Sequence, residues 1–582
     1  MSIFNGLTLF GGLALFLYGM DLMGKGLEQA SGGKLEKILE KLTSNIWKAV
    51  LLGVGVTSVI QSSSATTVMV VGLVNSGIMP LSRATGIIMG ANIGTTVTAW
   101  ILSLAGIESS NFFLQLLKPS SFSPVLAVIG MVLLMFSKRE RQRDIGNIMI
   151  GFAILMLGMD TMSGAVKPLA DVPEFTNILL MFSHPLLGVL AGALLTAVIQ
   201  SSSASVGILQ ALCMTGSVPF GTALPIIMGQ NIGTCITAIL SAIGANRNAK
   251  RAASIHLLFN LIGTTVFLTG FYTANLFLHF SFLEESISPA GIASIHTTFN
   301  VTATAMLLPF NRVLEKLAYL VLPETEEEKH TTPRTLDILD TRFLEAPGYA
   351  LEQGKAAAIA MFAEVRRALV TAASLPKDCQ ADQVAKIRES EELVDGYEDQ
   401  ICSYLLALSR KTLNEEEGQL QSVLLHTVSD IETISDQVCN IAIACKGLKE
   451  KDGTFSERAL RELAVQQKVV TELMDAVIVM FENPSMMDAC ACYQVANELA
   501  EDIKSRHMER LVLGECNISS GMALTDIVNS YERIAVRCMK IANYLSQVGE
   551  KELEIHDHEH LLSMSEYQGL YRNYKERFSL GV

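Results

Sequence analysis

Several kinds of site are missing from this 582-residue sequence. Its ten cysteines include no CxxC pair and no zinc-ligand spacing, so we expect reduced thiols in a cytosolic environment. Cys490 and Cys492 with His507 would supply only part of a metal site. The first apolar segment, Ile3 to Met20, lacks a basic leader and a small-residue cleavage site, so it predicts a mature membrane span rather than a secretory signal.

Charge is scarce in the first half of the chain. Residues 1–322 carry 17 Lys and Arg against 13 Asp and Glu, whereas the remainder carries 27 against 45. Apolar runs of about 15 to 25 residues fill the first part, and these are long enough to cross a bilayer core of roughly 30 Å. The second part has no such run. The chain therefore divides into a membrane domain and an acidic soluble domain.

The membrane domain contains a duplicated unit. TSVIQSSSAT (Thr57 to Thr66) returns as TAVIQSSSAS (Thr196 to Ser205), and IIMGANIGTTVT (Ile87 to Thr98) returns as IIMGQNIGTCIT (Ile226 to Thr237). One offset of 139 residues relates both pairs, and it also relates GMDLM to GMDTM further upstream. Matched clusters of amide and hydroxyl side chains are costly in hydrocarbon. The duplication therefore indicates a pathway for a polar solute rather than a repeat kept for packing.

The distribution of Lys and Arg predicts how the serine segments lie in the membrane. Between Trp47 and Arg83 lies an apolar segment of about 30 residues, which the serine cluster interrupts at its middle. Basic clusters precede this segment and recur two spans downstream, and cytoplasmic loops are enriched in basic residues. Both clusters lie on one side only if the serine segment is re-entrant. We therefore expect three spans per repeat (about 4–24, 86–105 and 123–137 in the first), which inverts the second copy.

The serine motifs have no local carboxylate. No acidic residue occurs between Glu40 and Glu108 or between Glu174 and Glu284. A solute bound there must meet hydroxyls, amides, backbone groups and helix ends. Serine hydroxyls donate hydrogen bonds to oxyanions and coordinate hard cations through their lone pairs, while the N-termini of broken helices favour anions. The predicted cargo is a small oxyanion that moves with Na⁺.

These residues resemble the sodium-phosphate cotransporter family, whose hallmark is a pair of QSSS motifs on inverted re-entrant hairpins. The resemblance covers roughly residues 1–320 and includes the GxNIGT blocks at Gly90 to Thr95 and Gly229 to Thr234. It implies that phosphate and Na⁺ bind Gln61, Ser62, Ser63, Ser64, Gln200, Ser201, Ser202 and Ser203, with Asn92, Thr95, Asn231 and Thr234 nearby. The assignment of each residue to the anion or the cation is left open.

Two histidines occur in the repeated texts SIHLLFN and SIHTTFN, which also resemble segments of bacterial family members. Ionisable groups inside spans are functional candidates, so His256 and His296 raise the hypothesis of a proton relay. The alternative is a neutral histidine that bonds a neighbouring helix, with Asn260 or Asn300 as partner. We expect the alternative.

The acidic second part is predicted to be a helical bundle. After a polar linker, apolar positions recur at helical spacing to about residue 548, as in Ser422 to Ala444. This part resembles the PhoU family of phosphate-signalling regulators, whose repeated helices carry an ExxxD metal-binding signature. Glu432 and Asp436 fit that signature. The second repeat keeps Glu532 but has Val536 in place of the aspartate, which argues against a second metal cluster.

The resemblance implies a divalent or iron-type metal at Glu432 and Asp436, which share one helix face. Further carboxylates would come from Asp430, or else from Glu391, Asp395 and Asp399. A solvated acidic surface or a partner-binding face is the alternative.

We therefore predict an all-α polytopic membrane protein with inverted repeats and two re-entrant hairpins, followed by a cytoplasmic antiparallel helical bundle. The predicted parts are a transport domain at 1–322 (repeat 1 about 1–137, repeat 2 about 146–278, a further span to about 310), a linker at 323–340 and a PhoU-like bundle at 341–582.

The predicted function is sodium-coupled symport of inorganic phosphate in the cell membrane by alternating access, with a regulatory C-terminal domain and no enzymatic activity. The alternatives are a membrane-bound phosphate sensor that does not transport, a phosphate exporter, and a transporter of another oxyanion. The resemblance alone implies a homodimer and a phosphate-signalling partner protein. No nucleic-acid partner is expected.

Overall fold

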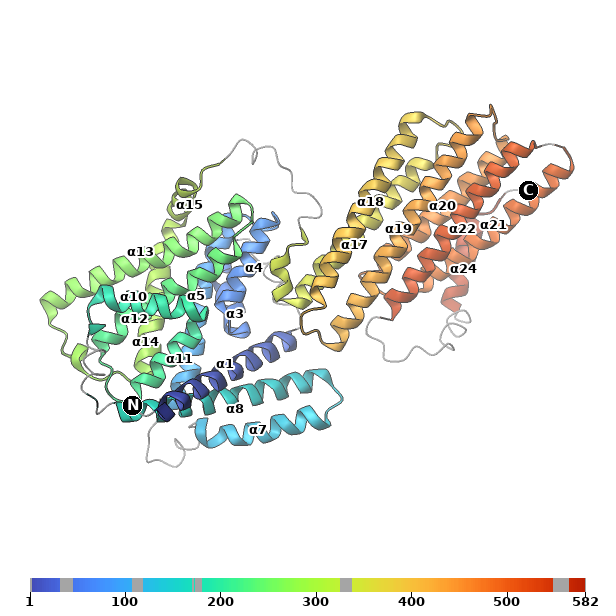
Figure 1. Cartoon of the computed structure of the whole chain (residues 1–582). Helices are drawn as coiled ribbons and strands as arrows, with labels where there is room; N and C mark the ends of the chain where they lie inside the picture. Colours follow the sequence, from blue (N-terminus) through green and yellow to red (C-terminus); the bar gives the residue numbers. More distant parts are fainter. Residues whose placement is uncertain are drawn as a thin grey trace. The chain divides into compact units, whose positions relative to one another are not determined.

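The computed structural model describes residues 3–31, 45–106, 119–169, 172, 181–324, 338–514, 516–547 and 565–580. Within these ranges the chain forms helices and turns and no β-strand, which confirms the predicted all-α class. The chain divides into two compact units, Met1–Tyr349 and Ala350–Val582 (Figure 1).

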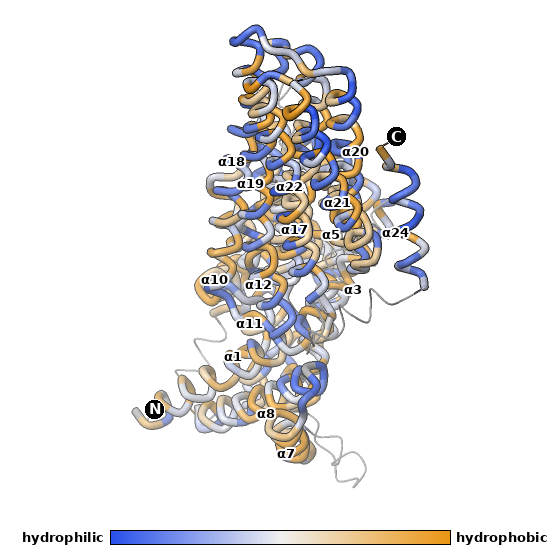
Figure 2. The backbone as a smooth tube through the Cα atoms, turned by 90° about the vertical axis from the view of Figure 1, so that its right-hand side faces the viewer, coloured by the Kyte–Doolittle hydropathy of each residue, from blue (hydrophilic) through white to orange (hydrophobic). Residues whose placement is uncertain are grey.

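The first unit is built for a membrane. Five of its described helices are long and apolar enough to cross one. These are α1 (Ile3–Ser31), α5 (Leu81–Ser103), α8 (Glu140–Val166), α12 (Phe220–Ser241) and α13 (Arg247–Leu278). Large apolar side chains such as Val198 and Phe277, each 81% exposed, lie on its surface, as lipid contact requires. Figure 2 shows hydrophobic residues concentrated on α1, α7 (Pro119–Phe136) and α8.

Each duplicated serine segment forms two short helices. In the first repeat these are α3 (Ile46–Ile60) and α4 (Ser63–Asn75), and in the second they are α10 (Pro185–Ile199) and α11 (Ser202–Cys213). The remaining described elements of this unit are η1 (Leu104–Gly106), η2 (Lys167–Leu169), η3 (Ser281–Glu284), α14 (Pro289–Leu307), η4 (Leu308–Phe310), α15 (Asn311–Val321) and η6 (Thr341–Glu345).

Glycines allow the helices of each repeat to touch through their backbones. A Cβ atom on Gly90 would collide with the carbonyl oxygen of Val50, which joins α5 to α3. A Cβ on Gly229 would collide in the same way with the carbonyl oxygen of Val189, which joins α12 to α10. Small residues at such positions let membrane helices approach closely. The block that follows each serine motif in the sequence thus packs directly on the helix that precedes it.

The second unit is a bundle of long helices (Figure 1). Its helices are α17 (Pro347–Ala372), α18 (Ala381–Leu408), α19 (Glu415–Lys449), α20 (Glu457–Met480), α21 (Met487–Val512), α22 (Ile518–Ser546) and α24 (Ser565–Arg577). Asn414 and Glu417 form a capping box that starts α19. A bidentate ion pair between Arg510 and Glu462, with both distances at 2.7 Å, lies inside the bundle.

Candidate functional site: two serine turns

Each QSSS motif forms the same left-handed turn between two helices. Gln61 has φ 60° and Gln200 has φ 59°, and each ends the helix before it. Such a conformation costs free energy in a residue other than glycine, and strained residues of this kind cluster at functional sites. The Oγ of Ser62 or Ser201 then accepts the backbone N–H three residues on, at 3.1 and 3.2 Å, and so caps the next helix. Both motifs therefore place a helix N-terminus directly behind a strained glutamine.

The first turn is tied to the block that follows it. Gln61, which is buried, accepts a hydrogen bond through Oε1 from Thr98 Oγ1 on α5 at 2.8 Å, and its Nε2 donates to the carbonyl oxygen of Ser58. Gln200, its counterpart, is exposed. The two turns thus share their backbone but differ in how the glutamine side chain is held.

The two turns meet each other. Ser64 Oγ donates to the backbone carbonyl of Gln200 at 3.4 Å. Because Ser64 lies in the first turn of α4 and Gln200 immediately precedes the cap of α11, the N-termini of these two helices approach each other. Of the six serines, Ser63, Ser202 and Ser203 are buried and the other three are half-buried. The contact joins the two motifs across 136 residues of sequence, through a hydroxyl of the first and a backbone carbonyl of the second.

The predicted residues outside the turns make other bonds. Thr95 and Thr234 donate to backbone carbonyls four residues earlier in their own helices, at 3.0 and 2.9 Å. Asn92 Nδ2 donates to Asn260 Oδ1 at 2.9 Å, whereas Asn231 Nδ2 bonds a carbonyl of its own helix. No bond between these four residues and a serine motif is found within the described ranges, so their part in the site stays a prediction.

The two histidines contact the two repeated asparagines. His256 Nε2 lies 3.4 Å from Asn92 Oδ1, and His296 Nε2 lies 3.4 Å from Asn231 Oδ1. The neighbouring-helix partner is therefore the asparagine of each GxNIGT block. Sequence reasoning missed this pairing. The sequence does contain an indication of this pairing, because two copies of SIHxxFN accompany two copies of GxNIGT.

Glu432 and Asp436 lie in a region of the bundle that is rich in carboxylates. Among the residues that the structure describes, no three His, Cys, Asp or Glu side chains lie close enough together to hold an ion. Burial and then the charge of Asp436 raise the pKa of Glu432, and burial and then Asp395 raise that of Asp436. Asp430 is instead bonded by Arg537 at 2.5 Å. The metal at Glu432 and Asp436 that the PhoU resemblance implied therefore stays a prediction.

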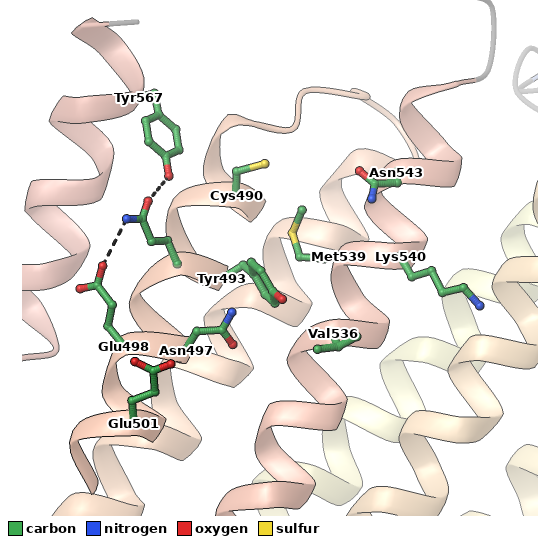
Figure 3. Close-up of a pocket in the computed structure, with 11 residues that line it drawn as sticks. Cys490, Tyr493, Asn497, Glu498, Glu501, Val536, Met539, Lys540, Asn543 and Tyr567 are labelled. Carbon is green, nitrogen blue, oxygen red and sulfur yellow. Dashed lines mark hydrogen bonds between the residues drawn. The ribbon is translucent and has the colours of Figure 1, made fainter. Parts of the chain in front are cut away.

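A pocket of about 560 Å³ lies between α21, α22 and α24 (Figure 3). The helices α21 and α22 are the second copy of the pair formed by α18 and α19, because α22 carries Glu532 where α19 carries Glu432. Its walls include Val536 and Lys540, and Tyr567 donates to Gln494 at 2.5 Å along its rim. Gln494 in turn donates to Glu498 at 3.2 Å. Val536 stands where the first copy carries Asp436.

Two family models match the chain. The Na⁺/Pi-cotransporter model matches residues 15–164 and 165–288, and the PhoU domain model matches residues 355–444. No solved structure matches.

Relatives match very different shares of the chain. The "Putative inorganic phosphate export protein YjbB" of Salmonella typhimurium is 26% identical over 82% of this chain and 84% of its own length. The "Uncharacterized protein YqeW" of Bacillus subtilis is 30% identical over 55% of this chain and 97% of its own length. The human "Sodium-dependent phosphate transport protein 2B" is 34% identical over 20% of each chain. The chain belongs to the Na⁺/Pi-cotransporter family and carries a PhoU domain after its membrane unit.

Proposed function

We propose that this protein is a sodium-coupled symporter of inorganic phosphate, in which the two serine turns form one central site. The contact between Ser64 and Gln200 carries the proposal, because it brings the N-termini of α4 and α11 together. Two adjacent helix N-termini supply free N–H groups and a positive potential, which favour a phosphate anion. Serine hydroxyls and glutamine oxygens suit Na⁺, which would offset the anion's charge during passage.

We further propose that both helix pairs are re-entrant. The 15 residues of α3 and the 13 of α4 measure about 22 and 20 Å at the rise of an α-helix, which is less than the roughly 30 Å of a bilayer core. The helices of the second pair are equally short, with 15 and 12 residues. Hairpins that enter from opposite sides would meet at the midplane, where alternating access exposes the site to either side.

A second candidate is phosphate export. The name of the YjbB relatives favours it, because these proteins match both the membrane unit and part of the C-terminal bundle. The same serine turns would serve either direction. A regulatory role for the cytoplasmic PhoU domain, a signalling partner and a homodimer remain predictions from the family resemblance.

Uptake of radiolabelled phosphate into proteoliposomes tests the proposal. We expect uptake under an inward Na⁺ gradient and none with K⁺. Gln61→Ala and Ser202→Ala should each lower the rate about tenfold or more, because a lost hydrogen bond to a charged group is worth about 1.5–3 kcal/mol. Thr265→Ala, an exposed hydroxyl on α13, is the matched control and should keep the native rate.

Three outcomes would contradict the proposal. Phosphate binding without flux in either direction would identify a sensor. Equal flux in Na⁺ and K⁺ would remove sodium coupling. Native rates in both site variants would place the pathway elsewhere in the membrane unit.

A further inference from the structure

After α15 the described chain resumes beside the first hairpin. Residues 340–345, here called the strap, comprise Asp340 and the short helix η6. Asp340 is 7% exposed and Phe343 is fully buried, although Asp340 ends the predicted polar linker and Phe343 lies only three residues beyond it. Such burial indicates that the strap packs on the membrane unit rather than forming a free linker.

The strap packs on the C-terminal half of α4. Asp340 Oδ2 accepts a hydrogen bond from Asn75 Nδ2, the last residue of α4, at 2.7 Å. The ring of Phe343 lies over Gly72, where a Cβ atom would approach Phe343 Cε1 to 2.7 Å. Glycine at position 72 therefore provides the space that the ring occupies. The strap thus holds the end of α4 opposite to the serine turn.

The same contacts extend to the second repeat. The backbone N–H of Asn246 donates to Asn75 Oδ1 at 2.8 Å, and Asn246 Nδ2 donates to the carbonyl of Asn75 at 2.6 Å. Arg342 Nε in the strap donates to the carbonyl of Ser241 at 2.7 Å. Since Ser241 ends α12 and Asn246 caps α13, the strap fastens α4 to the turn between these two helices.

The second hairpin has no counterpart of the strap within the described ranges. The offset of 139 residues places Ala211 where α4 has Gly72, and Met214 where it has Asn75. The methyl group of Ala211 would occupy the space of the ring. On α11 an aromatic ring packs instead at Gly207, where Phe16 of α1 lies. At the end of α11, Ser163 Oγ of α8 donates to Met214 Sδ at 3.1 Å. The chain therefore holds the second hairpin through α1 and α8, and the first through the segment that leads to the C-terminal bundle.

We propose that the strap is a brake on the first hairpin, through which the C-terminal domain controls the transport cycle. The proposal rests on the transport function proposed above. α4 is one 13-residue helix, so its serine turn moves as the end beneath the strap moves. If the hairpin shifts relative to α12 and α13, the bonds of Asn75 and Arg342 must break. Only Ala346 separates the strap from α17, so a displacement of α17 acts directly on these bonds.

A reversible cross-link tests the brake in the full-length protein. Asn75→Cys and Asp340→Cys are combined and joined by a short bis-methanethiosulfonate reagent in proteoliposomes, with each single variant as a reagent control. We expect the cross-linked protein to lose phosphate uptake at least about tenfold and to regain it with reductant, because one state of the cycle is then locked. The reduced double variant and Phe343→Ala should both exceed the native initial rate.

The remaining outcomes are equally decisive. Full uptake by the cross-linked protein, or failure of the two thiols to cross-link, would overturn the brake. A reduced double variant that is folded but inactive would show that the strap supports transport rather than restrains it. Absence of uptake by the native chain would instead overturn the proposed function and would be separate from these results.

Discussion

Duplication has had different results in the two units of this protein. In the membrane unit the two serine turns have nearly the same sequence and the same backbone conformation, with φ 60° at Gln61 and 59° at Gln200. In the bundle the corresponding helix pairs differ in charge. EELVD at residues 391–395 aligns with NELAE at 497–501, which places Glu398 and Lys504 at equivalent positions. The two serine turns touch and can form one site, whereas the two helix pairs of the bundle present faces of unlike charge.

The charges around Glu432 and around Glu532 show how the two helix pairs of the bundle differ. In the first copy Glu398 is one of the charges that raise the pKa of Glu432, after burial and the charge of Asp436. In the second copy Lys504 bonds Glu532, the counterpart of Glu432, at 2.5 Å. Lys504 thus offsets the negative charge of Glu532, whereas Glu398 adds to the negative charge around Glu432.

The largest expected effect tests whether the two membrane repeats are equivalent. Gly90→Ala and Gly229→Ala each force a methyl group against a carbonyl oxygen, so each should lower the free energy of unfolding of the membrane unit by about 3 kcal/mol, the upper end of the usual cost of overpacking. Gly55→Ala is the control, because nothing lies within 4 Å of its Cβ position. Thermal unfolding in detergent measures all three. A large loss in only one of the two repeats would end the equivalence.

Substitution of Gln61 and Gln200 tests how far the two serine turns are equivalent. Gln61→Ala removes the bonds to Thr98 and Ser58 and should cost about 1–2 kcal/mol of stability. Gln200→Ala should cost much less, because that side chain is exposed. Both should reduce phosphate uptake. If the two variants were equally unstable, the difference in environment would have no energetic consequence.

Local sequence patterns were enough to predict the helix breaks at the serine motifs and the all-α class. The breaks follow from the serine clusters that interrupt apolar runs, and the class follows from long apolar runs and helical spacing. It did not predict that Ser64 bonds the backbone of Gln200, since contacts between repeats depend on how helices pack. The strap was also missed. Phe343 belongs to no repeated motif, so the sequence gives no sign that it packs on the first hairpin. Its ring occupies the space above Gly72, which lies 271 residues away.

A smaller effect should appear in the first copy of the bundle. Because the folded-state pKa of Asp436 is raised, its stabilising contribution is full below the ordinary pKa near 3.8 and is lost as pH rises through the folded value. Asp436→Asn should therefore slow amide hydrogen exchange in α19 at pH 7 relative to the native chain, and the difference should shrink at pH 4. Equal exchange rates at both pH values would show that the repulsion is screened.

The smallest effect has the opposite sign and belongs to the second copy. Lys504→Met keeps the length of the side chain but leaves Glu532 without its cation. The two side chains are 36% and 28% exposed, so the pair is worth only about 0.2–1 kcal/mol. Exchange in α22 should quicken at pH 7 and return towards the native rate at high salt, whereas Asp436→Asn slows exchange in α19. If both substitutions slowed exchange, the lysine would not balance the second copy, and the contrast between the two faces of the bundle would fail.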